Sequence, residues 1–308
     1  MVDTRHRAIL APDNMRMAWE KVLSKKGAPG VDNITLQRWA RNWEANLERL
    51  RAQASTNTYQ PNRPRRIRVR KKDGGFREIS MLTVSDKVLQ RAVLNVVEAD
   101  FEARFLSCSH GYRPGRSVAT AIDQVLTYRD QGFGWLLDAD IRACFDSIDH
   151  HLLLSLVERV IKDWFTLNLM EKWLVASRKQ GNRPVGIPLG AVLSPLWCNI
   201  MLHQLDARLT SQKYKLVRYA DDFLVFSDTR AGAQAAMQAT MSILEKLKLQ
   251  LSPPKSQITS FKAGFRFLGV AFYKNQYSYL WEQKKILVEG RSTRLLYQHI
   301  PQAYQQDW

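Results

Sequence analysis

Two consecutive aspartates stand inside a stretch that otherwise has the pattern of buried strand. Asp221 and Asp222 interrupt the apolar run of "KLVRYADDFLVFSD" (residues 215–228), which resumes at once with Phe223. Adjacent carboxylates repel each other, and the interior of a strand disfavours aspartate. The pair therefore either lies at the tip of a hairpin as ordinary turn chemistry, or it holds something positive.

A second acidic group lies upstream, at the end of a predicted strand. In "LLDADIRACFD" (residues 136–146), Asp138, Asp140 and Asp146 surround that strand end. If one sheet brings it beside the hairpin tip, three carboxylates form a cluster that needs cations to stay ionised. Hard oxygen ligands favour Mg²⁺ or Mn²⁺, and two such ions roughly 4 Å apart form the usual site for in-line phosphoryl transfer.

The charge of the chain points to a polyanionic partner. Its 308 residues include 46 Lys and Arg against 29 Asp and Glu, a formal net charge of +17. The excess concentrates in "NRPRRIRVRKKDGG" (residues 62–75), whose cations are Arg63, Arg65, Arg66, Arg68, Arg70, Lys71 and Lys72. Such a run either guards a strand edge or contacts phosphates. Phosphate contact is favoured, with nucleic acid ahead of a membrane surface because no amphipathic apolar face accompanies the run.

Composition excludes several other classes of protein. A hydrophobic fraction of 45% is enough for one large domain or a few packed subdomains. No apolar window is long enough to cross a bilayer, and the start lacks the features of a signal peptide, so we expect a soluble, cytoplasmic prokaryotic protein. Cys108, Cys144 and Cys198 have no spacing typical of a disulfide framework or zinc site, which indicates free thiols.

The elements that must position these groups alternate between helices and strands. The pattern predicts helices over 13–54 with a break near Gly27–Gly30, a hairpin over 66–80 turning at 73–75, a helix over 84–105, a strand over 135–141 with a helix from about Asp149, the acidic hairpin, a helix over 232–249, and a strand at 265–273. Strict βαβ alternation is absent, so the sequence predicts an α+β or mixed-sheet core behind a mainly helical, basic front section.

These residues also carry a resemblance to a known family. A first group consists of the motifs "YADD", "DIRACFD", "GIPLGAVLSPLWCNI", "KLQLSPPKSQI" and "FRFLGVAF". A second group consists of "KGAPGVDNIT", "VRKKDGGFREIS" and "HGYRPGRSVATAI". The first group resembles the palm motifs of reverse transcriptases, and the second resembles the preceding blocks of the group II intron-like bacterial branch. The match runs from about residue 13 to about 272. Eight motifs in the family's order are far less expected by chance than any one of them.

The resemblance implies a right-hand polymerase fold and an RNA-directed DNA polymerase activity. Fingers with the start of the palm would cover 1–134, the palm 135–280, and a short thumb-like or partner-binding tail 281–308. The enzyme would extend a DNA or RNA primer on an RNA template with dNTPs, using two Mg²⁺ (or Mn²⁺) ions. Within the family the chain most resembles reverse transcriptases of CRISPR spacer acquisition, which suggests the CRISPR integrase or a structured RNA as partner. A defence enzyme templated by non-coding RNA and a group II intron-derived protein are the near alternatives.

The resemblance also assigns the metal ligands. In the family's motif the metal-binding Asp lies five residues before an aromatic, which selects Asp140 over Asp138 because Phe145 is that aromatic. The implied ligands are three carboxylates and one backbone carbonyl: Asp140, Asp221, Asp222 and Ile141. Asp138 shares the strand face of Asp140 and is a weaker candidate. Asp146 is expected to cap or turn the chain toward the following helix.

A further set of residues would bind the nucleotide. Phe145 would exclude a 2′-hydroxyl from beneath the incoming sugar, or it is simply a core aromatic. Lys71 or Lys72, with Arg77 across the hairpin, would hold the triphosphate, which suits the planar donor fork of arginine. Arg77 and one of the two lysines match fingers residues of the family.

Two more positions complete the expected nucleotide site. Lys255 matches a lysine that approaches the pyrophosphate leaving group, although a plain surface lysine fits as well. Leu189 stands where many relatives have Gln near the template and nucleotide, and leucine cannot supply the hydrogen bonds of an amide. Template positioning or fidelity is therefore expected to differ.

The end of the chain and the rival functions stay open. Tyr277, Tyr279 and Trp281 begin a terminal segment rich in apolar groups, which either packs back on the palm or binds a partner through residues 277–308.

Two functions from other classes of protein are the rivals. A two-metal nuclease would need neither the aromatic gate nor a triphosphate-holding hairpin. A non-catalytic RNA-binding protein would not keep an acidic cluster that repels RNA unless loaded with metal.

Overall fold

The computed structural model describes residues 4–25, 27–70, 75–178, 184–279 and 286–288, and it divides into two compact units. The first unit joins Met1–Arg104 to Phe145–Ile200, and the second joins Phe105–Cys144 to Met201–Trp308. Helices and strands are mixed in both, as the α+β expectation required. The division into fingers (1–134), palm (135–280) and tail (281–308) stays a prediction.

The first unit is mainly helical, with one hairpin. Its elements are α1 (Thr4–Ile9), α2 (Pro12–Ser24), α3 (Leu36–Ala40), α4 (Trp43–Ser55), β1 (Arg65–Arg70), β2 (Phe76–Met81), α5 (Val84–Glu102), α8 (His150–Glu158) and α9 (Trp164–Ser177). Helix α5 forms the centre: Thr83 caps it by accepting a hydrogen bond from the Asp86 amide, and α2 packs along its buried side. Two helices cross the unit boundaries, α7 (Cys144–Ser147) and α10 (Ser194–Ser211).

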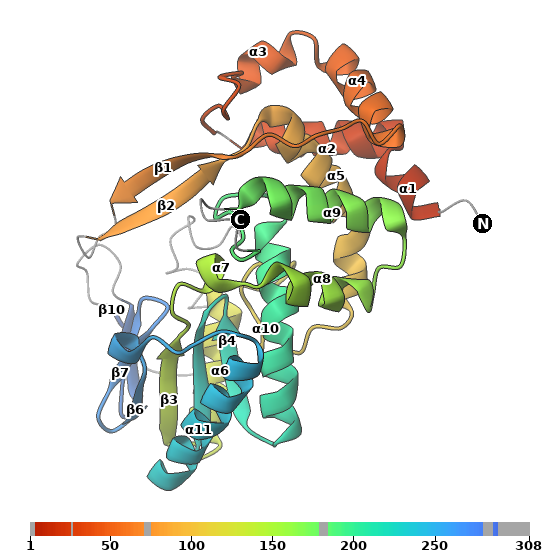
Figure 1. Cartoon of the computed structure of the whole chain (residues 1–308). Coiled ribbons are helices and arrows are strands. Elements are labelled where there is room, and N and C mark those ends of the chain that lie inside the picture. Colours follow the sequence, from red (N-terminus) through yellow and green to blue (C-terminus); the bar gives the residue numbers. More distant parts are fainter. Residues whose placement is uncertain (1–3, 26, 71–74, 179–183, 280–285, 289–308) are drawn as a thin grey trace. The chain divides into compact units, whose positions relative to one another are not determined.

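The predicted basic hairpin is present as β1 and β2, paired antiparallel (Figure 1). Its predicted turn begins in residues 71–74, which lie outside the described residues. Side chains alternate between the two faces, so Arg66, Arg68 and Arg70 share one face while Arg77, opposite Val69, lies on the other. The cations of the hairpin therefore lie on two separate faces.

Part of the basic run is engaged inside the unit. The Arg66 guanidinium donates a hydrogen bond of 2.6 Å to the carbonyl of Ser177, at the end of α9. Arg63 donates to the carbonyl of Arg178 just beyond it. Cations stabilise the carbonyl end of a helix, so these two arginines cap α9. Arg68 and Arg70 are exposed.

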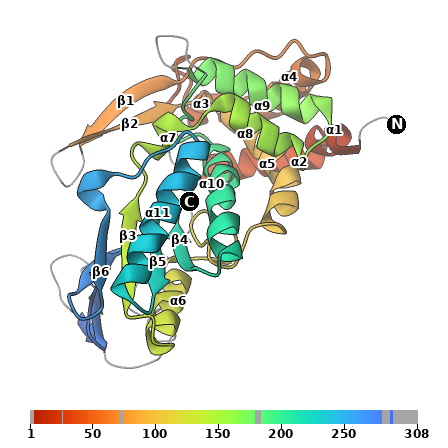
Figure 2. The same cartoon turned by 60° about the horizontal axis from the view of Figure 1, so that its bottom comes forward.

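The second unit is built on a four-stranded antiparallel sheet in the order β4-β5-β3-β6. The strands are β3 (Trp135–Asp140), β4 (Lys215–Tyr219), β5 (Asp222–Ser227) and β6 (Gln257–Ser260). Helix α6 (Val118–Asp130) packs over one face, where Leu136, Leu224 and Phe226 lie in its core cluster. Helix α11 (Arg230–Lys246) runs along β3, β5 and β6, and both views show it lying over this sheet (Figures 1 and 2).

A smaller sheet follows, in the order β10-β9-β8-β7. Its strands are β7 (Phe265–Phe267), β8 (Val270–Tyr273), β9 (Gln276–Tyr279) and β10 (Ile286–Val288). Phe265, Phe272 and Tyr277 turn inward to stack on one another and join the α6 cluster. The predicted strand at 265–273 is thus two strands, because Leu268 and Gly269 adopt positive φ and turn the chain between them.

Two exclusions drawn from composition can be compared with the structure. Cys108, Cys144 and Cys198 are free and buried, as predicted. Among the described helices, none has the length and apolar character needed to cross a membrane.

The two roles of the hairpin arginines lead to a testable difference. Arg68→Gln and Arg70→Gln should each lower the slope of log affinity against log salt for an RNA oligomer by about one unit, the change expected for the loss of one phosphate contact. Arg66→Gln should change the slope less and lower the melting temperature more, because it uncaps α9. Filter binding across a salt series measures the slopes. An unchanged slope in the Arg68/Arg70 double variant would place this face away from nucleic acid.

Candidate active site

The pairing of β3 with β5 brings the two acidic motifs together. Asp140, the last residue of β3, lies directly opposite Asp222, the first residue of β5. Asp138 is two residues back and opposite Leu224, so its side chain shares the same face. The strand end and the acidic hairpin are therefore neighbours in one sheet, as the sequence suggested.

The acidic hairpin turns one residue earlier than its sequence suggests. Tyr219 pairs with Asp222, which leaves Ala220 and Asp221 as a two-residue turn. Ala220 has a φ of 57° and Asp221 does not share the positive sign, the pattern of a type II′ turn, which usually has glycine at its first position. The Asp221 carbonyl accepts a hydrogen bond of 3.3 Å from the Ile141 amide. Asp221 is thus tied to the end of β3.

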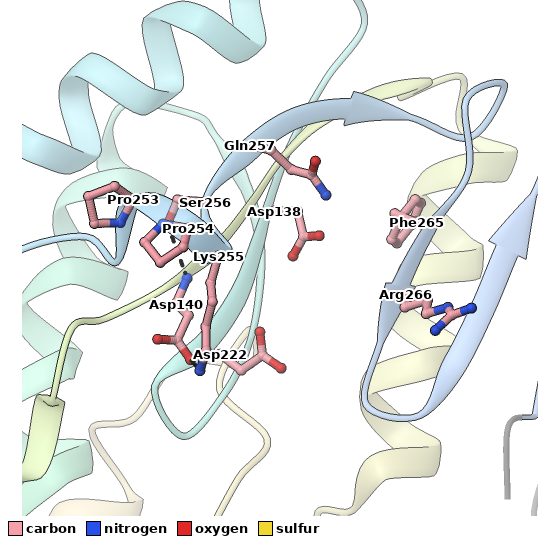
Figure 3. Close-up of a pocket in the computed structure, with 10 residues that line it drawn as sticks. All are labelled: Asp138, Asp140, Asp222, Pro253, Pro254, Lys255, Ser256, Gln257, Phe265 and Arg266. Atoms are coloured by element: carbon pink, nitrogen blue, oxygen red, sulfur yellow. Dashed lines mark hydrogen bonds and ion pairs between the residues drawn. The ribbon is translucent and has the colours of Figure 1, made fainter. Parts of the chain in front are cut away.

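The carboxylates face a cavity of about 610 Å³ in the second unit. Its lining comprises Asp138, Asp140, Asp222, Pro253, Pro254, Lys255, Ser256, Gln257, Phe265 and Arg266. Figure 3 shows the three aspartates and Lys255 gathered at one side, with Phe265 and Arg266 of β7 across from them. Lys255 Nζ lies 3.0 Å from Asp140 Oδ2. Asp221 is not part of this lining.

Burial and carboxylate crowding together set the electrostatics of the site. Burial, followed by the charges of Asp138, Asp140 and Asp221, raises the pKa of Asp222 to about 8, against the opposing effect of Lys255. Burial also raises the pKa of Asp138 to about 6. The hydrogen bond to Asp140 raises the pKa of Lys255 in turn. A single lysine therefore leaves the cluster in need of further positive charge.

The donor set fits a hard divalent cation, although the carboxylates would have to turn toward it. The acidic side chains of the cavity offer only oxygen ligands, which Mg²⁺ and Mn²⁺ prefer. Among the described residues, no three His, Cys, Asp or Glu side chains already close around one point as a metal site does.

Comparison with known proteins assigns the family. The family model described as "Reverse transcriptase (RNA-dependent DNA polymerase)" matches residues 69–272, which is most of the chain. The chain belongs to the reverse transcriptase family.

The similar proteins include a bacterial protein and intron-encoded proteins. Protein YkfC of Escherichia coli is 32% identical, with 85% of this chain and 81% of YkfC covered. The group II intron-encoded protein LtrA of Lactococcus lactis is 33% identical over 69% of this chain but only 36% of LtrA. Among solved structures, apo telomerase from Candida tropicalis superposes with a TM-score of 0.56 at 14% identity, covering 72% of this chain and 55% of the telomerase chain, a likeness of fold. This reverse transcriptase is thus similar to group II intron-encoded enzymes.

The predicted nucleotide-binding residues of this reverse transcriptase lie mainly in the first unit. The backbone of residues 184–189 organises two of them: Ile187 donates to the Phe145 carbonyl, and the Leu189 carbonyl accepts from Ser80 of β2, both at 2.7 Å. Phe145 and Leu189 are half-buried, so Phe145 is not enclosed as a core aromatic would be. Arg77 is exposed on β2.

Other predicted positions have different outcomes. Lys71 and Lys72 lie outside the described residues, as does most of the terminal segment 277–308. Tyr277 is described, and it packs back into the aromatic cluster at 2% exposure. The sequence predicts that Asp146 caps or turns the chain toward the following helix. The cap of α8 is provided by Asp149, which accepts from the Leu152 amide, while Asp146 lies within the short α7 just before it.

Sequence reasoning missed several residues around the site. Gln257, Phe265 and Arg266 line the cavity without belonging to either acidic motif. Arg218, one residue before the "YADD" motif, is fully buried against Asp206. A lone arginine inside an apolar strand pattern is a signal that could have been noticed, but its pairing with Asp206 of the preceding helix could not be read from the sequence.

The crowded carboxylates lead to a stability prediction. The pKa of Asp222 rises from 3.8 to about 8 on folding, so the folded state is penalised increasingly as pH rises from about 4 to 8. Asp222→Asn removes this penalty. In EDTA at pH 7 the variant should gain about 1–3 kcal/mol in its free energy of unfolding and lose less stability than the parent as pH rises.

Urea titrations across pH in EDTA measure this effect, with the exposed Asp228→Asn as the matched control. Added Mg²⁺ should stabilise the parent more than Asp222→Asn. A variant less stable than the parent in EDTA at neutral pH would show that Asp222 carries no such penalty.

Proposed function

We propose that this reverse transcriptase extends a primer with dNTPs on an RNA template by two-metal phosphoryl transfer. The observation that carries the proposal is the placement of Asp140 directly opposite Asp222 at one end of a sheet, beside a cavity that also contains Lys255. The two strands come from distant parts of the sequence and bring hard oxygen donors to one point. The family membership and the basic composition support the same reaction.

The proposed metal ligands are the carboxylates of Asp140, Asp221 and Asp222, with the Ile141 carbonyl as an extra donor. Bound divalent ions would activate the primer hydroxyl and stabilise the leaving oxygen. Register supports Asp140 and Asp222, and the hydrogen bond between the Ile141 amide and the Asp221 carbonyl supports the turn position of Asp221. Asp138 stays a secondary candidate on the same face.

The proposed nucleotide site adds residues with separate tasks. Lys255 would approach the pyrophosphate, a role that its 58% exposed side chain and its place in the cavity lining support. Arg77, with Lys71 or Lys72, would hold the triphosphate. Phe145 would act as the gate against ribonucleotides, and Leu189 would lie near the template and nucleotide without an amide to donate.

The biological setting that we propose is prokaryotic defence. The motif resemblance supports spacer acquisition, with the CRISPR integrase or a structured RNA as partner; the non-coding-RNA-templated and intron-derived alternatives predict other neighbours. Sequencing the nucleic acid that copurifies with the protein, and identifying the genes beside its own, separates these settings.

Primer extension tests the polymerase assignment directly. The parent should incorporate dNTPs on an RNA template in Mg²⁺, and Asp221→Asn should reduce the rate at least about 100-fold, because a lost metal ligand removes several kcal/mol of charge stabilisation. RNA binding and the melting temperature should change little. Asp228→Asn, an exposed aspartate just beyond β5, is the matched control. Extension by Asp221→Asn at the parental rate would refute the ligand assignment.

The gate is tested by the choice of sugar. Phe145→Ala should raise the ratio of rNTP to dNTP incorporation about 10- to 100-fold, the range that steric discrimination in a pocket provides. The dNTP rate should fall somewhat because the ring also packs against the bound sugar. Steady-state kinetics with matched rNTP and dNTP measure the ratio. If the ratio does not move, Phe145 is a packing residue only.

A further inference from the structure

An arginine lies buried beneath the acidic turn, on the opposite face of the sheet from the carboxylates. Arg218 of β4 pairs across the sheet with Phe223, whereas its neighbour Tyr219 pairs with Asp222. Successive residues of a strand point to opposite faces, so Arg218 points away from the cavity. Its side chain and that of Asp206, on α10, are both 0% exposed. Full burial of two charged groups requires an explanation.

The guanidinium of Arg218 is satisfied from three directions. Its Nε and Nη2 donate to the two carboxylate oxygens of Asp206, at 2.7 and 2.6 Å. Nη2 also donates to Ser109 Oγ at 2.7 Å. The remaining nitrogen, Nη1, donates to the carbonyl of Ala220 at 3.0 Å. The ion pair is therefore attached to the first residue of the turn that contains Asp221.

A loop holds the same turn from another side. The Arg218 amide donates to the Cys108 carbonyl, and the His110 amide donates to the Arg218 carbonyl, both at 2.8 Å. A Cβ added to the next residue, Gly111, would lie 2.5 Å from the backbone nitrogen of Ala220. This loop backbone therefore lies directly against the turn, and only glycine fits there.

Ala220 needs such support because of its own backbone. A non-glycine residue at a φ of 57° is strained, and such strain persists when the surroundings over-determine the conformation. A buried ion pair is a weak source of net stability compared with apolar residues of the same volume. The net stability of the ion pair therefore does not account for Arg218. What Arg218 contributes is the hydrogen bond that it makes to the turn.

We propose that Arg218, held by Asp206 and Ser109, is a positioning residue that sets the conformation of the Ala220–Asp221 turn. It thereby places the carboxylates of Asp221 and Asp222 for the reaction. This inference rests on the proposed function, since it concerns the same carboxylates. It assigns Arg218 no contact with substrate or metal.

Two variants of the ion pair should separate positioning from stability. Arg218→Lys keeps the charge opposite Asp206, but a compact ammonium cannot reproduce the planar fork that reaches both Asp206 and Ala220. Its kcat should fall about 10- to 100-fold, the scale of a small misplacement of catalytic groups. The KM for dNTP should stay within about twofold, as expected when only the reacting geometry changes. The rise in melting temperature on adding Mg²⁺ should also shrink, because the carboxylates no longer lie ready for the ion.

Asp206→Asn should show the reverse order of effects. Arg218 keeps its hydrogen bonds to Ala220 and Ser109, so kcat measured below the melting temperature should fall less than in Arg218→Lys. The melting temperature should fall more, because a buried charge has lost its partner. A purely structural ion pair would instead lose activity in proportion to stability in both variants, and that result would overturn the inference.

A pair of glycine variants tests the loop without touching any charge. Gly111→Ala forces the loop against Ala220 and should lower kcat while leaving the KM for dNTP nearly unchanged. Gly134→Ala, with no neighbouring atom within 4 Å of the added Cβ, should keep the parental kcat. If the ion-pair variants fail to fold, this pair still decides the question.

The outcomes distinguish the inference from the function on which it rests. A parent chain that extends no primer in Mg²⁺ contradicts the proposed function. A parent that polymerises, together with Arg218→Lys or Gly111→Ala variants that polymerise at the parental rate and gain as much stability from Mg²⁺, contradicts the positioning role alone.

Discussion

Mutual repulsion of carboxylates is the constraint on which the second unit depends. Antiparallel pairing of β3 with β5 sets Asp140 opposite Asp222, and burial together with the neighbouring carboxylates raises the pKa of Asp222 to about 8. Like charges in such a place lower stability unless a cation compensates them. The sheet tolerates the arrangement because apolar packing further along the same strands, from Leu136 and Phe226 against α6, stabilises the pairing.

The two faces of the sheet hold charged groups in different environments. The face with the carboxylates opens into the cavity, while the opposite face buries the Arg218–Asp206 pair beneath the turn. Charge on one face is exposed to ligands, and charge on the other is fully satisfied by protein groups. A strand of period two makes this separation possible, since consecutive residues can serve opposite environments. Arg218 and Tyr219 illustrate it within two positions.

Much of the fold was predictable because its signals are local. Periodicity and turn residues located α5, β3, the basic hairpin and the helix that starts after Asp149 within a few residues. The family also follows from the motifs and from their order along the chain. Local patterns were less exact at turns: the predicted strand at 265–273 is broken where Leu268 and Gly269 adopt positive φ, and Asp149 rather than Asp146 caps α8.

By itself, the sequence determined the chemistry available: acidic strand ends, a basic hairpin and the motif set of a reverse transcriptase. Only tertiary structure decided which of these groups meet. Register placed Asp140 opposite Asp222, and folding brought Arg63 and Arg66 of the basic run to the carbonyl end of α9. It also paired Arg218 with Asp206 of a separate helix. Residue types and short-range periodicity are encoded locally, whereas contacts between distant segments depend on how every layer of the core packs at once.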